Sequence, residues 1–179
     1  RRIRVSKRHH LRDCLIGTGF PFRDGSYLDT YLRMMKTMIE QTAGLRRPGA
    51  AALDRAYVAA GFDDGFWEVG LNAWDVAAGS LLIQEAGGLI GDLAGDGNFL
   101  HGGQVIAATP KIFAQMVTAL SPFRAEMLRE RAPKPVDPGS FASAAIILLT
   151  DGQTTTGPDP IESARMAAER GIRVFTVGV

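Results

Sequence analysis

The sequence predicts an α/β protein, in which short strands alternate with amphipathic helices. Three observations support this fold class. Apolar residues recur at helical spacing over residues 27–42 and again over residues 110–120. A short apolar segment bounded by glycines, residues 65–70, is typical of a strand. The nearly unbroken apolar run over residues 144–149 indicates a strand buried on both faces of a parallel sheet.

Glycines and prolines set the limits of the first elements. Residues 3–5 and 13–16 are expected to form two short strands, before Gly17 to Gly19 interrupts the pattern. A helix is then expected over residues 27–42. Its core-facing stripe is expected to consist of Leu28, Tyr31, Leu32, Met35 and Ile39.

The next helix is expected to begin at Pro48, where a missing N–H costs little, and to stop at Gly61. After the strand over residues 65–70, Asp75 opens a third helix that ends before Gly87. Two strands over residues 89–90 and 104–108 flank a Gly/Asp-rich hairpin turn, and Pro110 begins a fourth helix.

A change of composition predicts a second region. Residues 122–139 contain a charged run and three prolines, which predicts a linker or a join. Residues 140–179 then predict a strand, a helix over about residues 160–170 and a final strand, which together form a Rossmann-like β-α-β unit with a right-handed crossover. The expected organisation is therefore residues 1–121, a linker over 122–139, and residues 140–179.

The bulk composition limits the function classes. A net charge of +1 makes no case for nucleic acid, although basic residues crowd the first twelve positions. That basic segment indicates either a solvated strand edge or an anion- or RNA-contacting patch, and we favour the strand edge. The single cysteine, Cys14, excludes an intrachain disulfide and fits a buried thiol in a cytoplasmic protein. No stretch approaches the roughly 18 to 20 apolar residues of a membrane span. Because the chain lacks an initial Met and stops on a strand, we expect a fragment or a joined sequence.

The most informative segment for function runs over residues 68–79. Asp75 lies at an expected helix start, where free N–H groups and the helix dipole favour negative charge and attract phosphate. A carboxylate in that position suits a hard cation such as Mg²⁺, which is commonly held by one or two carboxylates together with phosphate oxygens. Trp74 is expected to pack beside such a site. The alternative is that Asp75 only caps the helix, and spacing alone favours this alternative.

The segment Trp74-Asp75-Val76-Ala77-Ala78-Gly79 resembles the C-terminal signature of the inositol monophosphatase family. Further segments are similar to that family in the same order, and the resemblance covers about residues 1–121. These segments are residues 17–22, 46–54, 66–68, 85–88 and 105–108. The resemblance implies a layered α/β half-domain of the inositol monophosphatase fold, in the C-terminal half of the family's sequence.

The resemblance also implies an activity and the residues that carry it. The activity is Mg²⁺-dependent hydrolysis of inositol monophosphates, with two or three Mg²⁺ ions stabilising charge on the attacking and leaving oxygens. Asp75 would be a metal ligand, and Glu68 would accept hydrogen bonds from substrate hydroxyls. Gly49, Ala50 and Ala51 would line the substrate pocket. The partner would be a small molecule similar to inositol monophosphate.

The chain departs from the family in one large respect. The family's other metal ligands come from an acidic N-terminal loop that does not occur here, and Asp13, Asp24 and Asp29 lie in the wrong contexts to replace it. The expectation is an incomplete active site, so that the chain alone is inactive. A half-domain also exposes apolar surface, so a homo-oligomer or a dependence on a missing half is expected.

Residues 137–179 resemble a fragment of the von Willebrand factor A domain, through Leu148-Leu149-Thr150-Asp151-Gly152 and the strand over residues 173–178. In that family Asp151 would support a Mg²⁺ site that binds an acidic group of a partner. The family's Asp-x-Ser-x-Ser loop is absent, so we favour a turn role for Asp151. Three hypotheses therefore stand: a phosphomonoesterase, a metal-dependent adhesion module, and a chimera with neither activity.

Overall fold

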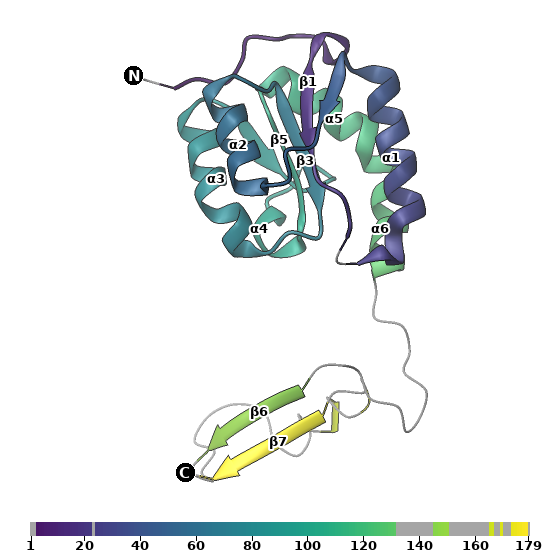
Figure 1. Cartoon of the computed structure of the whole chain (residues 1–179), viewed down its shortest axis with the longest axis vertical. Coiled ribbons are helices and arrows are strands. Elements are labelled where there is room, and N and C mark those ends of the chain that lie inside the picture. Colours follow the sequence, from purple (N-terminus) through teal and green to yellow (C-terminus); the bar gives the residue numbers. More distant parts are fainter. Residues whose placement is uncertain are drawn as a thin grey trace. The chain divides into compact units, whose positions relative to one another are not determined.

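The computed structural model describes residues 3–22, 24–131, 145–150, 165, 166, 169 and 173–178 (Figure 1). The chain divides into two compact units, Arg1–Arg131 and Ala132–Val179. No helix within the described residues is long and apolar enough to cross a membrane.

The first unit is built on a mixed five-stranded sheet with the strand order β2-β1-β3-β5-β4. β1 pairs in parallel with both β2 and β3, whereas β5 is antiparallel to β3 and β4. The strands are β1 (Leu15–Thr18), β2 (Gly44–Arg46), β3 (Gly65–Val69), β4 (Leu89–Gly91) and β5 (Gln104–Ala108). The sheet confirms the α/β fold class expected from the sequence.

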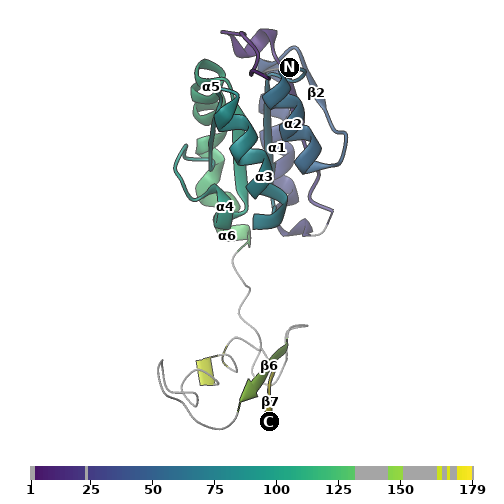
Figure 2. The same ribbon diagram turned by 90° about the vertical axis from the view of Figure 1, so that its left-hand side faces the viewer.

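Helices cover both faces of this sheet (Figure 1). One face carries α1, α5 and α6, and the other carries α2 and α3, which lie side by side in Figure 2. The helices are α1 (Leu28–Gln41), α2 (Ala51–Ala60), α3 (Ala73–Glu85), α4 (Phe99–Gly102), α5 (Pro110–Leu120) and α6 (Arg124–Arg131). Three short 3-10 turns accompany them, at Leu11–Asp13, Gly25–Tyr27 and Ser121–Phe123.

Two cores lie on the two faces of the sheet because successive strand residues point to opposite sides. Trp67 and Ile106 belong to the core under α1 and α5. Phe66 and Val105, their chain neighbours, belong to the core under α2 and α3. The central strands β3 and β5 are therefore buried on both faces, and their positions are fixed by packing from both sides.

Two expected features near the N-terminus are wrong. Residues 3–5 form no strand, and β1 begins at Leu15 and includes Gly17 and Thr18. Lys7, Arg8 and their neighbours are therefore exposed residues of an extended segment rather than a strand edge. Cys14 is fully buried, as expected, and burial raises the pKa of its thiol to about 12.

The helix over residues 27–42 is confirmed as α1, but only part of the expected stripe faces the core. Tyr31 is buried and Met35 packs against the core, as expected. Leu32 and Ile39 are 49% and 59% exposed, whereas Met34 and Met38 are fully buried. Tyr31 packs against Trp67, with ring centroids 5.0 Å apart, and the face of α1 that is buried with it carries Met34 and Met38.

The predicted boundary between the first unit and the linker, at residues 121–122, lies too early in the sequence. Residues 124–131 form helix α6, and Met127 is fully buried in the core under α1. Glu126 forms an ion pair with Arg33 of α1 at 2.6 Å, and Arg124 pairs with the buried Asp92 at 3.7 Å. The first unit therefore continues to Arg131, because one apolar side chain and two ion pairs anchor the charged run to it.

In the second unit, β6 (Ala145–Thr150) and β7 (Arg173–Gly178) pair in parallel, with Ala145 opposite Arg173 and Thr150 opposite Gly178. Parallel pairing is what a β-α-β unit requires. Arg165, Met166 and Glu169 are helical, within the range expected for the connecting helix. Asp151 lies outside the described residues.

Candidate functional site

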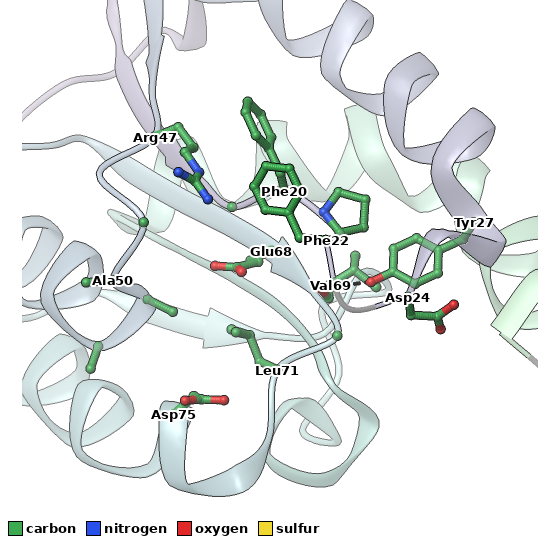
Figure 3. A pocket seen from close by; sticks show the side chains of 16 residues that line it. Phe20, Phe22, Asp24, Tyr27, Arg47, Ala50, Glu68, Val69, Leu71 and Asp75 are labelled. Atoms are coloured by element: carbon green, nitrogen blue, oxygen red, sulfur yellow. Dashed lines mark hydrogen bonds between the residues drawn. The ribbon is translucent and has the colours of Figure 1, made fainter. Parts of the chain in front are cut away.

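A cavity of about 420 Å³ opens at one edge of the five-stranded sheet (Figure 3). β1, β2 and β3 run in parallel, so their carboxyl ends meet at the same edge of the sheet. The segments that line the cavity follow these strands: residues 19–22 after β1, Arg47 after β2, and residues 69–71 at the end of β3. Carboxyl ends of parallel strands are the usual place for ligands in α/β folds.

All five residues proposed from the sequence for substrate and metal binding in the first unit line this one cavity. They are Gly49, Ala50, Ala51, Glu68 and Asp75. The structure brings them together from the start of α2, the end of β3 and the start of α3. The remaining sequence candidate, Asp151, cannot be placed because it lies outside the described part of the chain.

Asp75 occupies the third position of α3, whereas the sequence predicted that it opens the helix. Asn72 is the N-cap residue, so the interpretation of Asp75 as the cap itself is wrong. One carboxylate oxygen, Oδ2, accepts a hydrogen bond from the backbone N–H of Asn72 at 3.0 Å. This hydrogen bond fixes the side chain at the positive end of a helix, where a negative charge is stabilised.

Glu68 lies on β3, is half-buried, and has a strongly perturbed pKa of about 7. Burial is the largest cause of this raised pKa, and the negative charges of Asp54 and Asp75 add to the rise. The positive charges of Arg55 and Arg47 lower the pKa. Gly19 lies directly against the Glu68 carboxylate, and a Cβ at that position would collide with it. The glycine after β1 therefore makes room for the acid on β3.

A buried cation lies close to the site. The Arg55 side chain is fully buried and donates from Nη2 to the backbone carbonyl of Asp75. Its guanidinium carbon lies 5.3 Å from the centroid of the Phe66 ring, and Gly79 leaves space for it. Burial lowers the pKa of Arg55, while the nearby Glu68, Asp75 and Asp54 act in the opposite direction. One internal positive charge thus offsets part of the negative charge of the nearby carboxylates.

The wall of the cavity at the start of α2 is made of small residues. Gly49 has a φ of +91°, a left-handed conformation that favours glycine, and α2 begins at Ala51 rather than at Pro48. Ala50 is the N-cap residue. Backbone groups therefore border the cavity with no large side chain in front of them.

Sequence reasoning missed several lining residues and misplaced one. Asp24 was dismissed, yet it lines the cavity, and its side chain accepts a hydrogen bond from the N–H of Ser26 at 3.0 Å. Arg47, Phe20, Phe22 and Tyr27 also line it, and their place after β1 and β2 was the available signal. Trp74 was expected beside the site, but its side chain is 78% exposed and it does not line the cavity.

The donor chemistry of the cavity suits a hard cation only in part. Glu68 and Asp75 provide the oxygen donors that Mg²⁺ prefers. No group of three or more His, Cys, Asp or Glu side chains that could hold a metal occurs within the described residues. Completion of the site by other ligands remains a prediction.

Comparison with known proteins places this geometry in a family. The sequence profile of the inositol monophosphatase family matches residues 1–125. The chain is 54% identical over 124 residues to the Nus factor SuhB of Pseudomonas aeruginosa, covering 68% of this chain and 46% of that relative. It is 43% identical over 116 residues to the Nus factor SuhB of Escherichia coli, covering 65% of this chain and 43% of the relative.

Solved structures agree with the sequence relatives. The suhB protein of Bartonella henselae is 45% identical, with a TM-score of 0.64 over 67% of this chain and 46% of that one. An IMPase from Thermotoga maritima is 33% identical, with a TM-score of 0.62 over 71% of this chain and 48% of that one. None of these findings supports the resemblance of residues 137–179 to a von Willebrand factor A domain, or a chimera.

The chain spans about half the length of the curated relatives it matches. The match lies in its N-terminal part and includes the whole cavity. On the profile match, the relatives and the shared fold, the chain belongs to the inositol monophosphatase family.

Proposed function

We propose that the whole protein is a Mg²⁺-dependent phosphomonoesterase that hydrolyses inositol monophosphates or similar polyol phosphates. One observation carries the proposal. Three separate segments that resemble the family supplied the candidate residues, and all of these residues line a single cavity: Gly49, Ala50, Ala51, Glu68 and Asp75. Membership of the inositol monophosphatase family supports the same class of chemistry.

The residues of the cavity have separate proposed roles. Asp75 is a Mg²⁺ ligand, held at the helix start by Asn72. Glu68 accepts hydrogen bonds from substrate hydroxyls, and the backbone of Gly49 and Ala50 faces the polyol. When bound, Mg²⁺ supplies the positive charge that stabilises the phosphate during hydrolysis and activates a water molecule. The residues of this chain position the substrate and one side of the metal site.

We further propose that residues 1–125 correspond to the C-terminal half of the family's fold, so that this chain holds part of an active site. Each Mg²⁺ needs several oxygen ligands in near-octahedral geometry, and Asp75 supplies at most one or two. The helix start contributes about 1 kcal/mol of electrostatic stabilisation. An efficient enzyme must lower the barrier by roughly 8 kcal/mol or more.

The test of this proposal is phosphate release from inositol monophosphate with millimolar Mg²⁺. The chain alone is expected to release phosphate no faster than buffer. A mixture with the separately expressed part of the Pseudomonas aeruginosa relative that this chain does not match is expected to turn over. Turnover by the chain alone would show that an acid such as Asp24 completes the metal site, contrary to the incomplete-site proposal.

We also propose that the chain associates with a second copy of itself through the outer face of α3. This outer face consists of Trp74, Ala77, Ala78, Leu81 and Leu82, all exposed in the structure. The exposed Glu85 at the last position of α3 is the charged residue beside this face, while the charged residues Asp54 and Arg55 of the neighbouring α2 are buried. A mainly apolar surface is complementary to a second copy of itself, and two-fold pairing is the commonest arrangement of oligomers.

Sedimentation tests this association. Leu81→Glu is expected to shift a dimer of the chain to monomer, because it places a charge in the apolar contact. Leu32→Glu is the matched control, since Leu32 is 49% exposed on α1 and Leu81 is 60% exposed on α3. If Leu32→Glu dissociates the chain and Leu81→Glu does not, the interface is the exposed stripe of α1 and the assignment to α3 is wrong.

The names of the relatives give a second candidate, a role as a Nus factor. The observation that favours it is the exposed basic segment containing Lys7, Arg8 and Arg12, which suits an anionic partner. We place it below the phosphatase because the chain's net charge is only +1 and the ionisable residues of the cavity are mainly acids. The buried free thiol of Cys14 supports a cytoplasmic location for either role.

A further inference from the structure

Another cavity, of about 380 Å³, lies at the edge of the sheet opposite to the candidate functional site. Residues 5–9 form one wall, and residues 109–111, at the start of α5, form the other. This position follows from the strand directions. β5 is antiparallel to β3, so Ala108 at the end of β5 pairs with Gly65 at the start of β3. The two cavities therefore share no lining residue.

Hydrogen bonds fix the wall of residues 5–9 at both of its ends. At one end, the backbone N–H of Val5 donates to the carbonyl of Ala86 at 3.2 Å. At the other end, Nε2 of Gln115 donates to the carbonyl of His9 at 2.9 Å. Gln115 belongs to α5, so this side chain ties the segment to the helix that forms the opposite wall. The cavity is thus formed before a ligand enters, which lowers the entropic cost of binding.

The side chains around this cavity are basic, and none of its lining residues is an acid. Lys7, Arg8 and Lys111 are exposed cations. None of these three side chains makes a hydrogen bond or an ion pair with any residue that the structure describes. Three cations without a partner around one hollow create a positive potential that attracts an anion.

The hydroxyl of Thr109 adds a buried hydrogen-bonding group to the same cavity. Thr109 is only 5% exposed and is the N-cap residue of α5, yet its side chain makes no capping hydrogen bond. It has no other hydrogen-bond partner in the part of the chain that the structure describes. Buried hydroxyls are normally paired, and a threonine at this position normally caps the helix. The hydroxyl and the uncapped N–H groups of an 11-residue helix are therefore available to a ligand.

We propose that the cavity between residues 5–9 and the start of α5 is a binding site for a phosphate anion, separate from the candidate functional site. Lys7, Arg8 and Lys111 supply the positive charge, and the Thr109 hydroxyl and the N–H groups of α5 supply hydrogen bonds to the phosphate oxygens. The inference does not rest on the proposed function, although free phosphate is the product of that reaction.

The charges beside the cavity favour a compact anion over a polyanion. An adjoining cavity shares Lys7 and Arg8 with this one, but it is also lined by Asp13 and Asp64. A nucleic-acid backbone that continued from the site in that direction would meet these two acids. A single phosphate group uses the cations of the site without this repulsion, so we assign the site to free phosphate.

The test is a titration of the whole chain with inorganic phosphate, followed by backbone amide NMR at matched ionic strength. A chelator removes Mg²⁺, so that the result does not depend on the metal site. The amide signals of residues 109–112 are expected to shift and saturate, with a Kd on the order of 1 mM. Lys111→Ala is expected to weaken binding about tenfold, the effect of one charge-assisted hydrogen bond. Thr109→Val, which removes only the hydroxyl, is expected to weaken it about fivefold.

Arg12→Ala is the matched control. Arg12 belongs to the same basic segment and is exposed, but it does not line the cavity and lies 4.0 Å from the carboxylate of Asp13. This variant is expected to keep the affinity of the unmodified chain. Circular dichroism checks the fold of each variant, and Lys111 is exposed, so its replacement leaves the core intact.

Three results would overturn the inference. The first is an absence of saturation, or an equal loss of affinity in Arg12→Ala and Lys111→Ala, which would reduce the effect to net charge. The second is a set of shifts confined to residues 69–75, which would place the phosphate in the candidate functional site. The third is saturation of these signals by a short RNA oligonucleotide but not by phosphate, which would identify a polyanion surface. Each leaves the proposed function intact, because Glu68 and Asp75 lie in the other cavity.

Discussion

Asp75→Asn is expected to abolish Mg²⁺-dependent phosphate release by the mixture of this chain with the complementary part of its Pseudomonas aeruginosa relative. The substitution removes the negative charge that would hold a divalent cation, and losses of at least about a hundredfold to a thousandfold follow when a charge-stabilising group is removed. The amide oxygen of the substituted side chain is still able to accept the hydrogen bond from the Asn72 N–H, which Asp75 accepts at 3.0 Å. The helix start, and with it the fold, should therefore survive.

Measurements of phosphate release and of thermal unfolding separate the effect of Asp75→Asn on catalysis from its effect on folding. Activity should disappear while the free energy of unfolding changes by no more than about 1 kcal/mol, the usual contribution of a charge at a helix start. Asp151→Asn serves as the control, and it is expected to leave activity unchanged because Asp151 belongs to the second unit. A mixture that keeps full activity with the Asp75→Asn variant would show that Asp75 serves only the capping hydrogen bond of α3.

Glu68→Gln is expected to stabilise the folded chain above pH 7 and to weaken binding of inositol monophosphate. The folded-state pKa of Glu68 is raised from 4.5 to about 7, chiefly by burial. Below about pH 4.5 the carboxyl is protonated whether the chain is folded or not. Between about pH 4.5 and 7 the unfolded chain loses this proton while the folded chain keeps it, so stability falls as the pH rises through this window.

The size of the stability change follows from the same shift in the pKa of Glu68. A shift from 4.5 to about 7, discounted for the partial exposure of the side chain, corresponds to about 2 kcal/mol of stability lost by about pH 8. Gln is neutral at every pH and removes this loss. Urea unfolding at about pH 5 and about pH 8 should show the difference only for the unmodified chain and for Glu85→Gln, an exposed control on α3. Equal stability of Glu68→Gln and the unmodified chain at the higher pH would contradict the expectation.

Ionisation of Glu68 lowers the stability of the folded chain but is expected to strengthen substrate binding. Ionised Glu68 accepts hydrogen bonds from substrate hydroxyls more strongly than the protonated acid does, so affinity should rise as the pH increases through about 7. This rise should be absent from Glu68→Gln. A residue that lowers stability and strengthens binding is the pattern expected of a functional group.

Much of the candidate site was predictable because its residues lie in short local motifs. Glu68 and Asp75 flank one turn between β3 and α3, and Gly49 to Ala51 lead into α2. Local signals such as helix starts and small-residue runs predict these elements without knowledge of packing. Family resemblance then supplied roles that spacing alone did not, since spacing favoured Asp75 as a cap.

The rest of the site was not predictable from local patterns. Arg47 meets Phe20 and Phe22 only because β1 and β2 are parallel neighbours whose ends meet. The raised pKa of Glu68 depends on burial and on Asp54 and Arg55 from another helix. Such contacts join segments far apart in the chain, and no local pattern in one segment identifies the other segment that it contacts.

The sequence by itself determined the fold class, most of the helices and strands, and the family motifs that contain Glu68 and Asp75, because periodicity, glycine and proline act locally. It did not predict β2, α4 or α6, and it dismissed Asp24, which lines the cavity. Only the tertiary structure decided which faces are buried. α1 turned Met34 and Met38 rather than Leu32 and Ile39 to the sheet, and Trp74 was left on the surface. The charged run over residues 124–131 joined the first unit as α6. In each case the outcome depended on which surface packs against which, and that is settled by the whole set of packed elements rather than by any one of them.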